Sequence, residues 1–346
     1  MFFFPLLLFS CLLIWLFFSS RALAVEASSS MPFGGEFALE DAAAIASAHA
    51  VQILSQEASR EFTAMPVAAF ASNIAGSPQA WAFAALGMYV CDQKIDTGTR
   101  PNRVTVTWCT GVEDAPAIAM TEWVQAEMRQ PERLAWYGLV HERRILLLNE
   151  ALLLGADVSA YLTRRPEDAS PPQSPRLRQL ARSLTALDLF TACLPLYEEN
   201  GDGNGAWADP QAVIQAMQRA VLLDEHISLF WETLGDAYRQ INRTQLALEA
   251  LDRAVVLDPQ SAKARYLRAL VHLAPRTISL AEQDLDAAIR LAPDRAAYFE
   301  VRGGSINAPR GDYEAMCRDF RAACLLGVCR ALESARMVGY CADEGR

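Results

Sequence analysis

The chain has 346 residues, 52% of them hydrophobic, and a formal net charge of −10. This length is too great for one ordinary hydrophobic core and predicts two domains besides any targeting segment. An acidic chain repels phosphate backbones, which argues against a nucleic-acid partner, and no basic run is long enough to hold an anionic membrane.

The chain begins with an apolar run over residues 2–18. Small residues follow at Ala22 and Ala24, which fits a signal-peptidase site after Ala24. The sequence therefore predicts a signal peptide over residues 1–24 and an exported protein, periplasmic or extracellular. An uncleaved membrane anchor stays open, because no Lys or Arg precedes the run and its length is at the lower limit for a span. Lipidation of Cys11 is disfavoured because apolar residues continue past it.

The next part of the chain is predicted to be a leader and a helical domain. Residues 25–35 are small and polar, include two glycines, and are expected to form a flexible leader. Residues 36–163 are expected to form a mostly helical domain. Its helical patterns cover residues 40–65, 81–90, 117–128 and 132–154.

A segment within this domain differs in kind. Residues 96–101 have turn composition, and residues 104–108 alternate between apolar and polar in the manner of a strand. We predict a small β-hairpin closed by a disulfide between Cys91 and Cys109. Two unpaired thiols are the alternative.

The linker and the remaining cysteines follow. A proline- and serine-rich run over residues 164–175 cannot hold a helix and predicts a linker, after which helical pattern returns over residues 176–198.

Of the eight cysteines, seven lie beyond the predicted cleavage site, none in Cys-x-x-Cys spacing. Export favours disulfides between them. The odd number leaves one thiol over, which we assign to Cys193.

An acidic, glycine-rich loop starts at residue 198. Its oxygen-bearing side chains have the spacing of an EF-hand or dockerin-type calcium loop, with Gly203 at the sharp turn. Three departures weaken the match: a Glu at the first position, where Asp is usual, Gly205 where an apolar residue is expected, and the lack of a partner loop in the sequence. The alternative is a surface turn inserted in a degenerate repeat. The candidate calcium ligands are Glu198, Asn200, Asp202, Asn204 and Asp209.

A 34-residue period dominates the chain from about residue 209. One unbroken set has the spacing of a helix-pair consensus: Trp231, Leu234, Gly235, Tyr238, Ala247, Leu251, Ala254, Leu257 and Pro259. Its later members recur 34 residues on as Ala281, Leu285, Ala288, Leu291 and Pro293. After one inserted residue in the turn over 305–310, the pattern continues at Met316, Phe320 and Ala323.

This set resembles the tetratricopeptide-repeat (TPR) family over residues 209–325. The resemblance implies antiparallel helix pairs that stack into an α-solenoid, because one pair cannot bury its apolar face alone. It also implies a protein or peptide partner on the concave face, which the first helix of each pair forms. The face is mixed and mildly acidic, which suggests a partner carrying Lys or Arg; a merely solvated face is the alternative. The matching positions are Glu232, Asp236, Arg239, Lys263, Tyr266, Glu300 and Asn307.

The C-terminal cysteines predict a fastened cap. Cys317 and Cys324 share one helix face but lie about 10 Å apart along it, too far to pair with each other. A turn at Gly327 starts an antiparallel capping helix and places Cys324 opposite Cys329. The nested pairs Cys324–Cys329 and Cys317–Cys341 follow. The crossed pairing 317–329 with 324–341, or a four-cysteine metal site, is the alternative.

The predicted fold is therefore mainly α: an N-terminal helical domain with a small β-hairpin, then a short TPR-like solenoid over residues 176–346 with a disulfide-fastened cap. The sequence contains no nucleophile elbow, P-loop or dinucleotide-binding motif, so no enzyme is predicted and no cofactor beyond calcium. We expect an exported scaffold for a protein or peptide partner. The alternatives are a ligand- or cell-wall-binding protein whose activity lies in residues 36–163, and a purely structural envelope component.

Overall fold

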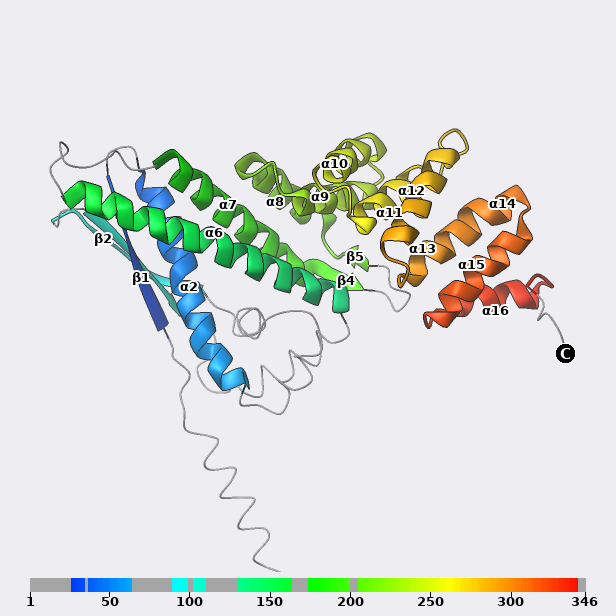
Figure 1. Ribbon diagram of the computed structural model, residues 1–346, viewed down its shortest axis with the longest axis horizontal. Helices are drawn as coiled ribbons and strands as arrows, with labels where there is room; N and C mark the ends of the chain where they lie inside the picture. The colour runs from blue at the N-terminus through cyan, green and yellow to red at the C-terminus, as the bar shows by residue number, and fades with distance from the viewer. Residues whose placement is uncertain are drawn as a thin grey trace, which may run out of the picture. The chain divides into compact units, whose positions relative to one another are not determined.

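The computed structural model describes residues 26–34, 37–63, 89–98, 102–109, 130–163, 174–199 and 205–341. The chain divides into two compact units, residues 1–181 and 182–346, and each is described by itself (Figure 1). The predicted signal peptide, most of the predicted linker and the predicted helix over 117–128 lie outside the described residues. None of the helices that the structure describes combines the length and apolar character needed to cross a membrane.

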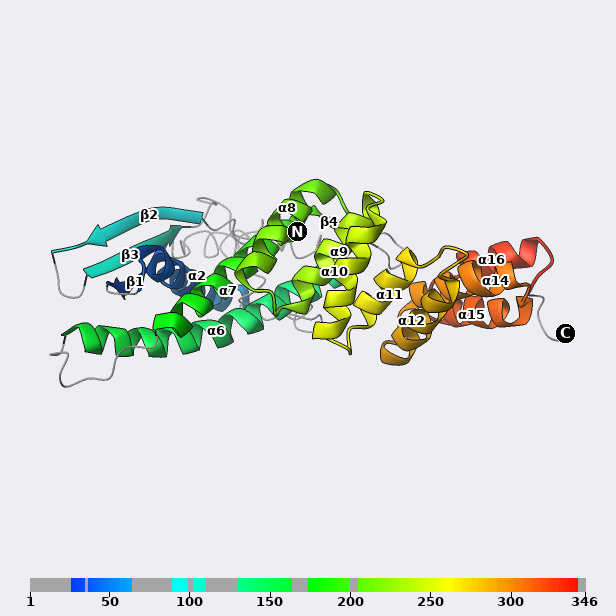
Figure 2. The same cartoon turned by 90° about the horizontal axis from the view of Figure 1, so that it is seen from above.

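The first unit contains a three-stranded antiparallel sheet, in which β3 lies between β1 and β2 (Figure 2). The predicted hairpin is present as β2 and β3, and Cys91 bonds to Cys109 across it. The elements of this unit are β1 (Glu26–Phe33), α2 (Leu39–Thr63), β2 (Tyr89–Asp96), β3 (Asn102–Cys109) and α6 (Pro131–Thr163), with α7 (Ser174–Cys193) crossing into the second unit.

Two expectations for this unit are wrong. The flexible leader over 25–35 is replaced by β1, whose residues pair along the whole of β3. The helix expected over 81–90 cannot reach its predicted end, because β2 begins at Tyr89; residues 81–88 are not described. β1 pairs with a strand more than 60 residues further along the chain, and a short polar segment carries no periodic pattern that predicts such a pairing.

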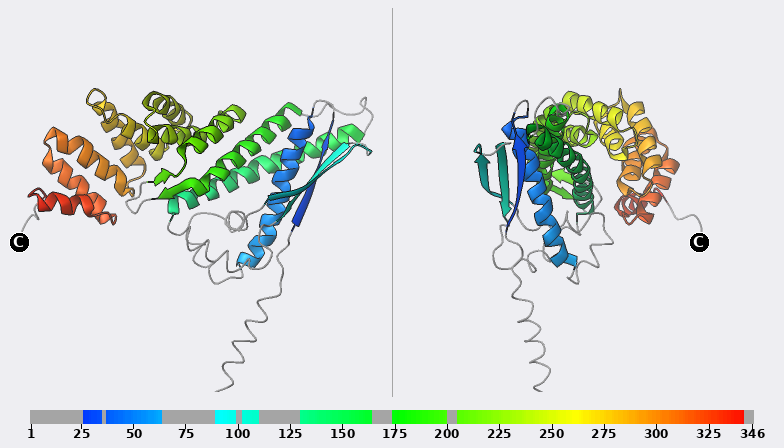
Figure 3. Two further views of the ribbon diagram at one scale, coloured as in Figure 1. Left: turned by 180° about the vertical axis from the view of Figure 1, so that it is seen from behind. Right: turned by 60° about the vertical axis from the view of Figure 1, so that its left-hand side comes forward.

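Side-chain alternation explains how the sheet is covered. Val104 and Val106 of β3 are almost completely buried, and α2 lies against β1 and β3 (Figure 3). The cross-strand pair Ser28 and Thr107 is joined by a side-chain hydrogen bond of 2.8 Å. One face of the sheet is therefore apolar and packed on the helix, and polar pairs line the other.

The second unit is a row of helix pairs (Figure 1). The first, or A, helices are α9, α11 and the continuous run α13–η3–α14; the second, or B, helices are α10, α12 and α15. Their bounds are α8 (Pro210–Leu223), α9 (Ser228–Gln240), α10 (Thr244–Leu257), α11 (Ala262–Val271), α12 (Ile278–Leu291), α13 (Ala296–Val301), η3 (Arg302–Asn307), α14 (Ala308–Arg310), α15 (Tyr313–Leu325) and α16 (Arg330–Met337).

The repeat spacing has a direct packing cause. In the α9–α10 pair, a Cβ on Gly235 would lie 2.6 Å from Cγ of Leu251, so only glycine permits this approach. Ala247 and Ala254 of α10 are fully buried. Small side chains thus let α9 and α10 approach closely, as the pattern predicts.

A small hairpin interrupts the degenerate first pair, α7 and α8. The helix predicted over 176–198 is wrong at its end: α7 stops at Cys193, and a 3-10 turn, η2 (Leu194–Leu196), follows. Pro195 has no N–H to continue the helix. The chain then forms β4 (Tyr197–Glu199) and β5 (Gly205–Trp207), which pair antiparallel.

The inserted residue of the last repeat lies within a helix. It was expected in the turn over 305–310, but the structure absorbs it as a π-helical turn, η3, in the middle of the A helix. A π turn has hydrogen bonds one residue longer than those of an α-helix, so it accommodates one extra residue without ending the helix. The repeat positions that follow it, such as Met316 and Phe320, are therefore shifted by one residue in sequence and are still buried.

The C-terminal cap has the nested connectivity. Cys317 bonds to Cys341 and Cys324 bonds to Cys329, which fastens α16 to α15. The turn at Gly327 has a φ of 95°, a conformation that glycine adopts without strain. Among the cysteines that the structure describes, Cys193 is the free thiol, and it is buried.

Candidate binding surface on the repeat helices

The seven predicted partner-binding residues all lie on A helices, but most of them face other parts of the chain. Glu232, Asp236, Tyr266 and Asn307 are buried, with at most 8% of each side chain exposed. Arg239, Lys263 and Glu300 are half-buried. The four buried side chains therefore contact other parts of the chain, whereas the repeat pattern predicted that they face a groove.

Glu232 fixes the start of the next repeat. It accepts a hydrogen bond of 2.7 Å from the hydroxyl of Ser261, the residue that caps α11. The same hydroxyl accepts a bond from the backbone N–H of Ala264. A carboxylate on α9 thereby positions the N-terminus of α11, which also favours its negative charge.

Asp236 is the centre of a buried polar cluster. Its Oδ1 accepts bonds from Nε and Nη2 of Arg239, at 3.0 and 2.7 Å. Its Oδ2 accepts from the indole N–H of Trp207 and from the amide of Gln240, at 3.0 and 3.1 Å. A carboxylate that is 3% exposed is thus fully satisfied by its own chain.

Lys263 of α11 contacts Tyr197 of β4. Its ammonium lies 5.1 Å from the centre of the Tyr197 ring and 3.2 Å from the Tyr197 hydroxyl. This is a cation–π contact combined with a hydrogen bond. The β4–β5 hairpin therefore contacts two of the predicted groove residues, Asp236 and Lys263.

The two remaining buried residues support the later repeats. The ring of Tyr266 packs on that of Tyr298 with centroids 4.6 Å apart, within the core between α11 and α13. Asn307 donates a 2.8 Å bond to Asp319. It was expected to face the groove, but it is buried at the end of η3.

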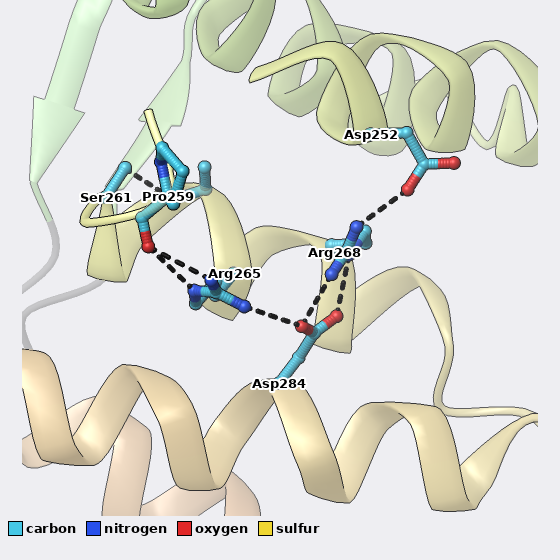
Figure 4. Close-up of polar contacts among 7 residues, drawn as sticks. Asp252, Pro259, Ser261, Arg265, Arg268 and Asp284 are labelled. Carbon is cyan, nitrogen blue, oxygen red and sulfur yellow. Dashed lines mark hydrogen bonds and ion pairs between the residues drawn. The ribbon is translucent and has the colours of Figure 1, made fainter. Parts of the chain in front are cut away.

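An arginine clamp between repeats was not foreseen. Arg268 of α11 lies between two carboxylates from neighbouring B helices, Asp284 and Asp252 (Figure 4). Arg265 also approaches Asp284, at 3.8 Å, and donates to the carbonyl of Pro259. The hydrogen bond to Asp284 is the main cause that raises the pKa of Arg268 above its ordinary value.

The clamp recurs one repeat later. Arg302 donates to both carboxylate oxygens of Asp319 and to Asp286. Because Arg268 and Arg302 are 34 residues apart, the repeat spacing could have revealed this position. The consensus comparison concealed it, since an apolar residue is expected where each Arg stands.

The proposed calcium loop is only partly described. Glu198 is exposed in β4, and Asp209 caps α8 by accepting a 3.0 Å bond from the N–H of Ala212. Asn200, Asp202 and Asn204 lie outside the described residues. The calcium site stays a prediction.

Comparison with known proteins identifies the repeats. Residues 235–274 match the family model described as TPR repeat. Residues 235–274 therefore form a tetratricopeptide repeat. The matched segment runs from Gly235 of α9 through α10 and α11, the best-formed part of the predicted period. No curated protein matches the chain.

Several solved structures share local similarity with this TPR chain. A crystal structure of MamA is 23% identical and covers 37% of this chain and 71% of its own, with a TM-score of 0.32. YrrB, described as a TPR protein with an unusual peptide-binding site, is 16% identical and covers 59% of this chain and 99% of its own, with a TM-score of 0.36. Both scores are below 0.5, so neither structure supports a conclusion about this chain's ligand.

Proposed function

We propose that this TPR chain is an exported, non-enzymatic scaffold that binds a segment of a protein partner on the A-helix face of its repeats. The observation that carries the proposal is the match of residues 235–274 to the TPR model together with three successive packed helix pairs. Stacked helix pairs create extended concave surfaces that suit chain-like ligands.

The structure narrows the part of the face that a partner can use. The β4–β5 hairpin contacts α9 and the start of α11, so the accessible stretch begins further along α11. Leu270 of α11 and Val301 of α13 are half-buried and also pack against the core between the helices, and Gly304 is exposed on the π turn. Glu300 of α13 is half-buried, and its carboxylate suits a partner segment that carries a Lys or Arg.

A charge reversal tests the location. Glu300→Lys should weaken capture of the partner at least tenfold, and Glu249→Lys, on the exposed side of α10, is the matched control. The partner is first identified by affinity capture from the envelope fraction and then titrated as a purified protein. Equal affinity for both variants and the unmodified chain would refute the assignment to this face.

Export is supported by independent features. The apolar run over 2–18 resembles a signal peptide, and three disulfides suit an oxidising compartment. Cell fractionation of the full chain and of a chain lacking residues 1–24 tests this part. We expect the full chain outside the cytoplasm with its disulfides formed, and the shortened chain inside with reduced thiols.

A further inference from the structure

The β4–β5 hairpin lies where a ligand would lie on this face. Its two aromatic residues, Tyr197 and Trp207, are 1% and 3% exposed, and they contact Lys263 of α11 and Asp236 of α9. Both helix residues occupy groove positions in the repeat pattern. In Figure 1 the hairpin lies beside α9 and α11, on the side away from α10.

The contacts are those of a recognition site for aromatic side chains. The indole N–H of Trp207 donates to Asp236, and its backbone N–H donates to the side-chain oxygen of Gln240. The ammonium of Lys263 lies over the face of the Tyr197 ring and donates a hydrogen bond to the Tyr197 hydroxyl. The site therefore contacts the N–H edge of the Trp207 ring and both the face and the hydroxyl of the Tyr197 ring, besides enclosing the two rings.

The hairpin is shaped for this position. The rings of Tyr197 and Trp207 pack with centroids 4.8 Å apart, and a Cβ at Gly205 would overlap the Tyr197 ring. Three-residue strands form only a marginal hairpin by themselves. The hairpin thus depends on α9 and α11 for its stability, as a bound ligand does.

We propose that Asp236, Gln240 and Lys263 form a binding site for an extended protein segment bearing Trp and Tyr, and that the β4–β5 hairpin is its intramolecular occupant. The inference rests on the proposed scaffold function and adds a regulation to it. The tethered hairpin competes at a high effective concentration, so an external aromatic segment gains the site only when the hairpin leaves. A hairpin that is released about 1% of the time weakens external binding roughly 100-fold.

A peptide titration tests the site without any partner. The probe is a fluorescent peptide with the sequence of residues 195–209, added to the full chain and to the Tyr197→Ala/Trp207→Ala double variant. The double variant should bind the probe at least tenfold more tightly than the unmodified chain. Adding Asp236→Asn and Lys263→Ala to the double variant should abolish the gain, whereas adding Glu249→Gln on α10 should leave it unchanged. A folded double variant, with unchanged far-UV circular dichroism, that fails to bind the probe would overturn the proposal.

Native-state hydrogen exchange covers the case in which the double variant does not fold. In the unmodified chain, the amides of residues 197–199 and 205–207 should exchange through a local opening that leaves α9 and α10 protected. If these amides exchange only when the whole chain unfolds, the hairpin is a permanent part of the fold and the proposal is refuted. Neither experiment involves the envelope partner. The scaffold function is tested separately by the Glu300→Lys titration, so the failure of one proposal can be told from the failure of the other.

Discussion

Arg302 donates two hydrogen bonds to the carboxylate of Asp319, at 3.0 Å from Nε and 2.6 Å from Nη2. The equivalent pair one repeat earlier, Arg268 and Asp284, is one residue closer in sequence. The π turn at η3 supplies the extra residue, so the clamp is kept although the frame has shifted. The extra residue is thus accommodated inside the A helix, at η3, and not in the loop between the A and B helices.

The Arg302–Asp319 clamp should contribute strongly to the stability of the last repeat. Asp319 is 4% exposed, so Asp319→Asn leaves Arg302 without its main charged partner and should lower the free energy of unfolding by about 2–4 kcal/mol. Arg318→Ala is the control, because its pair with Glu314 is exposed and should contribute no more than about 0.5 kcal/mol. Urea unfolding followed by circular dichroism measures both. Equal losses would contradict the structural role of the clamp.

The two glycines of the π turn should respond differently to alanine. A Cβ at position 303 would lie 2.8 Å from Cε1 of Phe320, so Gly303→Ala should cost about 1–3 kcal/mol. At Gly304 the nearest atom would be 3.8 Å away. Gly304→Ala should therefore be neutral or stabilising by up to about 1 kcal/mol, since it reduces the freedom of the unfolded chain. Thermal unfolding compares the two variants, and a larger loss for Gly304→Ala would contradict the close packing of Gly303 against Phe320.

The two disulfides of the cap should differ in their contribution to stability. Cys317 and Cys341 are separated by 24 residues, and Cys324 and Cys329 by 5. Loop-closure entropy then predicts about 3.5 kcal/mol for the first bond and about 2 kcal/mol for the second. Paired Cys→Ser variants, unfolded under non-reducing conditions, test the order. A larger loss from removing the short loop would show that strain or packing decides instead.

Cys193 should be an unreactive thiol. Burial raises its pKa to about 11, so the thiolate fraction at pH 8 is far below that of an ordinary cysteine. Alkylation of the native full chain and of Cys193→Ser should proceed at the same rate. After denaturation without reductant, the unmodified chain should gain one further alkylated site relative to the variant. Rapid modification of Cys193 in the native chain would contradict its burial.

The residue pattern by itself determined the helix pairs, their 34-residue period and the fastened cap. These features depend on local spacing, because helix geometry decides which side chains share a face and which cysteines lie opposite each other. Helix spacing also predicted the nested cap pairs, whereas turn composition and strand alternation predicted Cys91–Cys109.

Only the tertiary structure decided what the groove residues contact. Asp236 and Lys263 stand at ligand-facing positions of the repeat, and nothing in the period shows that Tyr197 and Trp207 cover them. The pairing of β1 with β3 was hidden for the same reason. Such contacts join segments distant along the chain, and they depend on which surfaces meet after the helices have packed.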